Sequence, residues 1–235
     1  MSRLEAVIFD VDGTLVDSER DGHRVAFNAA FEEAELPDRW DVATYGRLLE
    51  ITGGVKRMAH WFESTGRSPA EALRLAERLH ERKTRIMRRL VEDGQVRARP
   101  GAHRLIAELE AGGVAVHVAT TGTRAWVEPL LENAFGSSFR TVVTGTEVAD
   151  LKPSPAAYLE VLRRTGCAPE SAVAVEDSGN GVAAAVGARL RCVAAHNPYT
   201  RGDDLSGATL VAAGLDDPRL VAWFQRELKP PDERG

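Results

Sequence analysis

The chain has 235 residues, of which 43% are hydrophobic and 28% charged, and its formal net charge is −5. This length allows one good core, or a core domain with a smaller insert. The acidic balance argues against a nucleic-acid partner, which would need a basic face, and no uncharged apolar stretch is long enough to span a bilayer.

The two cysteines, Cys167 and Cys192, lie far apart and form no CxxC motif, so we expect free thiols in a reducing compartment. The amino terminus, MSRLEAVIFD, enters an apolar run almost at once and lacks the hydrophobic region of a signal peptide. These features predict a cytoplasmic protein without a membrane partner, and we treat it as a monomer.

The first expected strand is AVIFD, residues 6–10, a nearly continuous apolar run that suits the centre of a sheet. The next segment, residues 18–96, is rich in charge and has helical spacing throughout. Its clearest helix has Ser68 as N-cap, Pro69 as first helical residue and Gly94 at its end. Residues 18–96 therefore read as a helical insert, with hinges at 16–18 and 97–101.

From about Pro100 onward, short apolar runs alternate with helical patterns. The expected strands are VAVHVAT (114–120), RTVVT (140–144), SAVAVED (171–177) and RCVAA (191–195), and the expected helices are HRLIAELEA (103–111), PAAYLEVLRRTG (155–166) and NGVAAAVGA (180–188). Such alternation predicts an α/β fold with a Rossmann-like parallel sheet core, formed by 1–17 and 97–235, and an inserted α-helical domain at 18–96.

Polar residues follow four of the expected strands, at the edge where open parallel sheets bind ligands. They are Asp10 and Asp12; Thr120, Thr121 and Gly122; Lys152; and Glu176 and Asp177. Taken singly, each has a structural explanation: a strand-end cap for Thr120, a solvated lysine for Lys152, and helix-start acids for Glu176 and Asp177. Asp10 and Asp12, on either side of one valine, are harder to explain in this way.

Taken together, these residues make chemical sense. Carboxylates from two strand ends form a hard oxygen site suited to Mg²⁺, which would partly neutralise their repulsion. A carboxylate can then attack phosphorus, while a hydroxyl, backbone N–H groups and a lysine hold the oxygens of the transferring phosphoryl group. The set therefore indicates phosphoryl transfer.

DVDGT, the threonine of VAVHVAT, LKPSP and VEDSGNG occur in the order of the four motifs of the haloacid dehalogenase superfamily of phosphatases, which the chain resembles over nearly its whole length. The resemblance implies that Asp10 is the nucleophile and Asp12 the general acid and base. It implies that Thr120 and Lys152 bind phosphoryl oxygens. Asp10, Asp177 and the backbone carbonyl of Asp12 would bind Mg²⁺, with Glu176 as an auxiliary metal residue. Dehalogenating members lack the second aspartate, so Asp12 favours a phosphorus substrate.

The helical insert corresponds in this resemblance to a cap that closes over the site and selects the substrate. Within it, Thr52, Gly53 and Gly54 precede Lys56 and Arg57, which indicates a tight turn presenting two cations. The alternatives are a solvated basic helix start and an anion site for a second, non-reacting phosphate. Candidate substrate-binding residues are Glu19, Thr52, Gly53, Gly54, Lys56, Arg57, Thr121 and Gly122.

ERDGHRVAFNAAF, ATTGT and NPYTRGDDLSGA resemble one subgroup, the sugar-bisphosphate phosphatases encoded beside Rubisco, which act on xylulose 1,5-bisphosphate. That subgroup's turn usually reads Thr-Gly-Gly-Lys-Glu-Arg, whereas here Val55 and Lys56 stand at its Lys and Glu positions. We therefore expect a Mg²⁺-dependent phosphatase that acts on a small phosphorylated sugar through an aspartyl-phosphate intermediate, with a sugar bisphosphate such as xylulose 1,5-bisphosphate as first candidate. The alternatives are a phosphoglycolate or broad sugar-phosphate phosphatase, a mutase similar to the more distantly resembling β-phosphoglucomutase, and a non-catalytic phosphate sensor.

Overall fold

The computed structural model describes residues 3–230, in which six strands form one parallel sheet in the order β3-β2-β1-β4-β5-β6. The strands are β1 (Ala6–Phe9), β2 (Ala115–Ala119), β3 (Thr141–Val143), β4 (Ala172–Glu176), β5 (Arg191–Ala195) and β6 (Leu210–Ala212). β1 pairs with β2 on one side and β4 on the other, so its predicted central position is confirmed.

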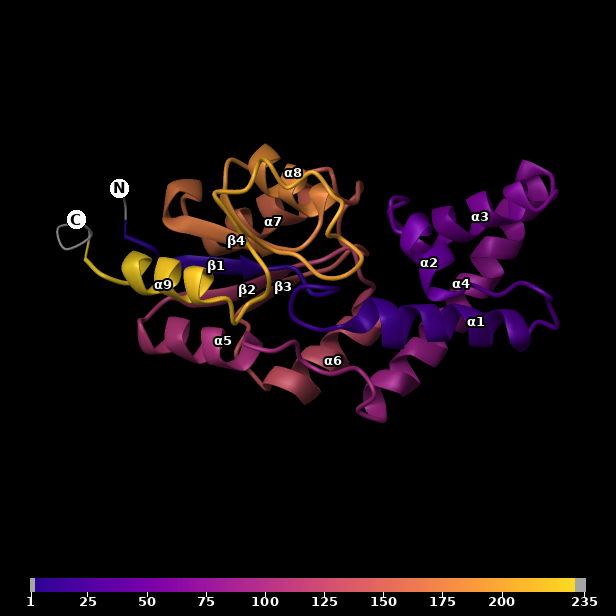
Figure 1. The fold of residues 1–235 in the computed structure, drawn as a ribbon, viewed down its shortest axis with the longest axis horizontal. Helices are drawn as coiled ribbons and strands as arrows, with labels where there is room; N and C mark the ends of the chain where they lie inside the picture. Colours follow the sequence, from indigo (N-terminus) through magenta and orange to yellow (C-terminus); the bar gives the residue numbers. More distant parts are fainter. Residues whose placement is uncertain (1–2, 231–235) are drawn as a thin grey trace.

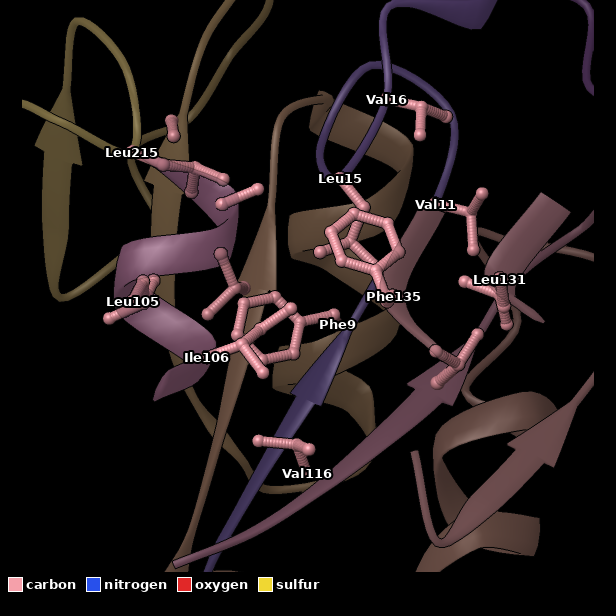
Figure 2. Close-up of a cluster of buried hydrophobic side chains, with 14 of the residues drawn as sticks. Phe9, Val11, Leu15, Val16, Leu105, Ile106, Val116, Leu131, Phe135 and Leu215 are labelled. Atoms are coloured by element: carbon pink, nitrogen blue, oxygen red, sulfur yellow. The ribbon is translucent and has the colours of Figure 1, made fainter. Parts of the chain in front are cut away.

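Successive side chains of β1 pack on opposite faces of the sheet, which is why the whole strand is apolar. Val7 and Phe9 belong to the cluster on one face, and Ala6 and Ile8 to the cluster on the other. Figure 2 shows Phe9 in the first of these clusters, close to Ile106. Because β1 is buried on both faces, the residue that follows it, Asp10, is also buried and lies at the carboxyl end of the strand.

Helices cover both faces of the sheet, as Figure 1 shows. α7 (Ala156–Thr165) and α8 (Gly179–Gly187) contribute to one hydrophobic cluster, and α5 (Ala102–Ala111), α6 (Arg124–Phe135) and α9 (Pro218–Glu227) to the other. A short 3₁₀ turn, η2 (Pro169–Ser171), precedes β4. This layered arrangement confirms the predicted α/β fold class with its Rossmann-like sheet.

The five expected strands and the three expected core helices are all present, but sequence patterns did not indicate β6, α6 and α9. β6 is a three-residue edge strand in which only the last residue is buried, so its apolar signal is weak. α6 contains Pro129, a residue that normally argues against a helix interior. None of the helices between residues 3 and 230 combines the length and apolar character needed to cross a bilayer.

The segment of residues 18–96, which follows β1, is largely helical, as predicted, and lies beyond the carboxyl ends of the strands in Figure 1. Its elements are the short π-helical turn η1 (Glu19–His23), α1 (Arg24–Glu32), α2 (Val42–Leu48), α3 (Gly54–Ser64) and α4 (Pro69–Glu92). It has a hydrophobic cluster of its own, with Phe27, Phe31, Trp40, Tyr45 and Phe62 fully or almost fully buried.

The two chain connections between the helical insert and the sheet run side by side. Val16 forms an antiparallel bridge with Ala98, and the N–H of Arg99 donates to the carbonyl of Leu15 at 2.8 Å. Buried residues near the end of α4, such as Met87, belong to the same cluster as Trp126 of α6. The insert is therefore attached to the sheet domain by paired connections and by packing of α4 near α6.

The predicted start of α4 is confirmed, because Ser68 and Glu71 form a capping box around Pro69. We predict that Ser68→Ala lowers the free energy of unfolding by about 1 kcal/mol, since the Ser68 hydroxyl no longer donates to the Glu71 carboxylate at the helix start. Urea unfolding measures this loss. The control, Ser137→Ala in an exposed loop, should change the free energy by less than about 0.5 kcal/mol. An equal effect of both changes would show that the cap contributes nothing.

Candidate active site

Five of the polar residues predicted at the strand ends line one cleft of about 750 Å³, whereas Thr120 and Glu176 are not among its lining residues. Its core side is lined by Asp10 and Asp12 after β1, Thr121 after β2, Lys152 before α7, and Asp177 after β4. Its insert side is lined by residues that include Glu19, Thr52, Gly53 and Arg57. The cleft therefore lies between the sheet domain and the helical insert.

Lys152 lies inside the carboxylate cluster rather than in solvent. Its Nζ donates to Asp10 Oδ1 at 2.6 Å, to Glu176 Oε1 at 2.6 Å and to the carbonyl of Ala119 at 2.8 Å. Only 5% of its side chain is exposed. Burial opposes the charged form, but the two carboxylates outweigh it and raise the pKa of Lys152. The explanation of Lys152 as a solvated lysine is therefore excluded.

Asp10, Glu176 and Asp177 are all buried, and one oxygen of each lies within 4.8 Å of the others. Burial raises the pKa of Asp10 to about 8; Lys152 opposes this change, while Glu176 and Asp12 add to it. Burial also raises the pKa of Asp177 well above its ordinary value, and Asp10 and Glu176 reinforce the effect. Clustered hard oxygen donors suit a small divalent cation such as Mg²⁺, which would displace the protons that burial favours.

Glu176 points its carboxylate at neighbouring donors. Besides Lys152, it accepts from the hydroxyl of Tyr158 at 2.6 Å and from the N–H of Asp177 at 3.2 Å. Gly181 packs against it so closely that a Cβ there would overlap the carboxylate. Glu176 and Asp177 are thus interior residues, not exposed acids at a helix start.

Gly13 allows the loop after β1 to approach Asp177. It has φ +83°, a conformation that side chains other than glycine rarely adopt, and a Cβ would overlap Asp177 and Asn197. Asn197 Nδ2 donates to Asp177 Oδ2 at 2.7 Å, and the Thr14 hydroxyl donates to Asp177 Oδ1 at 3.3 Å. The glycine of DVDGT is therefore a requirement of close packing at the carboxylate cluster.

Asp12 faces a different set of partners. Its Oδ1 accepts from the Ser18 hydroxyl and from His23 Nε2, the latter at 2.8 Å. His23 Nδ1 in turn accepts from Lys83 Nζ at 2.8 Å. Burial tends to raise the pKa of Asp12, but the interactions with His23 and Ser18 prevail and hold it below its ordinary value. Burial also lowers the pKa of Lys83, to about 8.

Sequence reasoning missed this chain of groups behind Asp12. His23 lies in ERDGHRVAFNAAF, which sequence analysis singled out only for its resemblance. Lys83 occupies a position in the buried stripe of α4, between Leu79 and Ile86, and is 5% exposed. A lysine at an apolar position of an amphipathic helix was the available signal.

The segment after β2 differs in detail from the expected anion site. Thr120 is buried, and its Oγ1 accepts from the N–H of Gly122 at 3.0 Å. Thr120 therefore does cap the strand end, although its own hydroxyl hydrogen can still be donated. Thr121 lines the cleft, whereas the Gly122 N–H is directed at Thr120.

The two cations of the insert have different surroundings. Arg57 is 8% exposed; its Nε donates to the carbonyl of Leu48 at 3.0 Å and its Nη1 to the Tyr45 hydroxyl at 3.1 Å. The Tyr45 hydroxyl donates to Glu19 Oε2. Lys56 is exposed and does not line the cleft, so the solvated helix start describes Lys56 but not Arg57.

The glycines beside these cations shape the start of α3. Gly53 has φ +97° and lines the cleft, while Gly54 lies against His80 of α4. Thr52 accepts a hydrogen bond from Asn180 Nδ2 at 3.1 Å, which links the insert to α8 of the core. The predicted turn is thus present at the interface of the two parts.

A family model for the haloacid dehalogenase-like hydrolases matches residues 4–189. The chain belongs to this family. Among haloacid dehalogenase-like hydrolases, it is 42% identical over 209 residues to protein CbbY of Rhodobacter capsulatus, covering 87% of this chain and 91% of that protein. The resemblance inferred from the motifs, and with it the expected phosphoric monoester hydrolase, is confirmed.

Two further relatives are similar to this chain over most of their length. A variant of CbbY from Rhodobacter sphaeroides, crystallised with xylulose 1,5-bisphosphate, superposes with a TM-score of 0.81 at 36% identity, covering 90% of this chain and 95% of that one. Phosphoglycolate phosphatase 1 of Pseudomonas aeruginosa is 30% identical over 240 residues, covering 97% of this chain and 83% of that protein.

The raised pKa of Asp10 makes the stability of the fold depend on pH. A carboxyl group with a raised folded-state pKa contributes stability below its unfolded pKa and loses it as pH rises through about 8. We predict that raising the pH from about 6.5 to about 8 lowers the melting temperature of the metal-free wild type more than that of Asp10→Asn. Mg²⁺ competes with the protons, so it should stabilise the wild type more at the higher pH.

Melting curves in EDTA and in Mg²⁺ at both pH values provide the measurement. The difference in melting temperature between the wild type and Asp10→Asn isolates the effect of Asp10 from that of other titrating groups. A wild-type response to Mg²⁺ that is the same at both pH values would contradict the raised pKa of the cluster.

Proposed function

We propose that the chain is a Mg²⁺-dependent phosphatase that hydrolyses a phosphorylated sugar through an aspartyl phosphate on Asp10, with a sugar bisphosphate such as xylulose 1,5-bisphosphate as preferred substrate. The observation that carries this proposal is that the two aspartates of DVDGT have different partners. Asp10 lies with Lys152, Glu176 and Asp177, whereas Asp12 is bonded to Ser18 and His23.

Asp10, Asp177 and the backbone carbonyl of Asp12 would hold the metal. When bound, Mg²⁺ supplies positive charge that offsets the repulsion between Asp10 and an incoming phosphate and stabilises the transferring group. Glu176 is better placed to hold Lys152 than to bind the metal directly, since its oxygens accept from Lys152, Tyr158 and the Asp177 N–H.

In the first step, an Asp10 oxygen attacks phosphorus and the bond to the sugar oxygen breaks. Lys152 and the Thr120 hydroxyl are the donors proposed to hold the phosphoryl oxygens. The leaving alkoxide takes a proton from Asp12; that proton comes from His23 Nε2, while His23 Nδ1 takes a proton from Lys83 Nζ. In the second step, Asp12 takes a proton from water, the water oxygen attacks phosphorus, and phosphate leaves Asp10 as a free carboxylate.

Residues 18–96 are proposed to act as the cap that selects the substrate, with 1–17 and 97–235 as the catalytic core; residues 1–2 and 231–235 lie outside the described part. Support for a bisphosphate comes from Arg57, which lines the cleft, and from the CbbY variant that bound xylulose 1,5-bisphosphate. A monomeric, cytoplasmic enzyme without nucleic-acid or membrane partners is also part of this proposal.

A second candidate substrate is phosphoglycolate, favoured by the relative from Pseudomonas aeruginosa. Phosphoglycolate has a carboxylate where a bisphosphate has a second phosphate, so Arg57 could face either group. Phosphate release from xylulose 1,5-bisphosphate, other sugar phosphates, phosphoglycolate and p-nitrophenyl phosphate, each with Mg²⁺ and with EDTA, tests the proposal. The highest kcat/KM for phosphoglycolate would overturn the bisphosphate assignment.

Asp10→Asn and Asp12→Asn should affect different steps. We predict that Asp10→Asn remains folded but loses turnover by on the order of a thousandfold or more, because the nucleophile is gone. Asp12→Asn should slow both departure of the alkoxide and attack by water, so mass spectrometry of quenched enzyme should find either little phosphoenzyme or a long-lived one. Near-normal turnover of Asp10→Asn would exclude the covalent mechanism.

Arg57 and Lys56 form a matched pair for testing the distal site. If Arg57 faces a distal phosphate, Arg57→Ala should lose roughly 1.5–3 kcal/mol, or on the order of ten- to a hundredfold in kcat/KM, for a sugar bisphosphate. It should change little for p-nitrophenyl phosphate, which has no second anion. Lys56→Ala is the control and should leave both substrates unaffected, because Lys56 is exposed and outside the cleft. Equal losses by Arg57→Ala on both substrates would instead indicate a role in cap structure through Tyr45 and Leu48.

A further inference from the structure

Arg99 joins the second insert–core connection to the loops that surround the carboxylate cluster. Its guanidinium donates through Nη1 to the carbonyl of Gly13, through Nη1 to the carbonyl of Ala195 at 3.1 Å, and through Nη2 to the carbonyl of His196 at 3.2 Å. Its own N–H donates to the carbonyl of Leu15 at 2.8 Å. One side chain therefore ties the loop after β1 to the end of β5.

The contact with Gly13 matters because this residue directly follows Asp12, whose carbonyl is a proposed metal ligand. The N–H of Gly13 donates to the carbonyl of Val16 at 2.9 Å. In a trans peptide the C=O and N–H groups point in opposite directions, so this bond turns the Asp12 carbonyl away from Val16. Arg99 holds the next carbonyl along the chain, so both peptide groups of Gly13 are fixed.

Asn197 links the same arrangement to Asp177. Its Nδ2 donates to Asp177 Oδ2 at 2.7 Å and lies 3.3 Å from the Gly13 carbonyl that Arg99 also contacts. Asn197 follows His196, whose carbonyl accepts from Arg99. The guanidinium thus bonds to the carbonyl of Gly13, which follows Asp12, and to the carbonyl of His196, which precedes the asparagine that bonds to Asp177.

We propose that Arg99 is a positioning residue for the metal site: by bridging the Gly13, Ala195 and His196 carbonyls, it holds the Asp12 carbonyl and Asp177 at the spacing that a divalent cation requires. This inference rests on the proposed Mg²⁺-dependent function and adds a residue outside the four motifs. Groups that orient metal ligands typically alter metal affinity by about 10- to 100-fold when they are changed. A lysine carries its three donors on one nitrogen and cannot reproduce the planar fork of a guanidinium.

The test compares Arg99→Lys and Arg99→Ala with Arg97→Lys. Arg97 is an exposed residue of the same connection, so its replacement is a matched control. Isothermal titration with Mg²⁺ and melting curves in EDTA and Mg²⁺ measure binding without turnover. We expect both Arg99 variants to bind Mg²⁺ about tenfold or more weakly, and Arg97→Lys to bind like the wild type.

A kinetic measurement separates positioning from general destabilisation. With p-nitrophenyl phosphate, the Mg²⁺ concentration for half-maximal activity should rise about tenfold in Arg99→Lys, while kcat at saturating Mg²⁺ falls much less. If Arg99→Ala does not fold, the Mg²⁺ affinity of Arg99→Lys alone tests the inference. Folded Arg99→Lys with wild-type Mg²⁺ affinity overturns the inference and leaves the proposed function intact, whereas a wild type that binds no Mg²⁺ overturns both.

Discussion

The candidate active site depends on one electrostatic imbalance: the buried carboxyl groups of Asp10, Glu176 and Asp177 lie together, and the ammonium group of Lys152 bonds to the first two of them. Burial alone would drive such carboxyl groups towards their neutral forms. The surrounding residues counter this with hydrogen-bond donors, among them Tyr158 on Glu176 and Asn197 on Asp177. The pKa values of Asp10 and Asp177 nevertheless stay raised, so the cluster would release protons when it binds a divalent cation.

The same constraint explains the close packing of the backbone around the cluster. Gly13 and Gly181 each approach a carboxylate so closely that a Cβ would overlap it. The loops after β1, β4 and β5 must therefore keep fixed separations. Hydrogen bonds from Asn197 and Arg99 to the Gly13 carbonyl supply part of that rigidity.

In the proposed mechanism, the helical insert supplies residues to the site as well as covering the cleft. His23 and Lys83, the groups behind Asp12, both come from the insert, and the His23 ring stacks edge-on against Trp126 of the core with centroids 4.8 Å apart. Asp12 therefore has its partners only when insert and core are packed together. On the other side of the cleft, Arg57 is held by Tyr45 and Leu48, so whatever anion it meets must approach a largely immobilised guanidinium. Immobilisation favours selectivity, because little side-chain freedom remains to be lost on binding.

The sequence by itself determined the features that local patterns encode: the central place of AVIFD, the alternation of strands and helices from Pro100 onward, the start of α4 at Ser68 and Pro69, and the four motif positions at the strand ends. Hydrophobic periodicity and the preferences of turn and capping residues act over a few positions, so a single sequence is enough to recognise them. Only the tertiary structure decided which side chains meet across long separations. Lys83 reaches His23 from 60 residues away, and Arg99 reaches the Gly13 carbonyl from 86 residues away. It also decided that Arg57 is buried while its neighbour Lys56 is exposed, because that difference depends on how α3 packs against the rest of the insert, not on residue type.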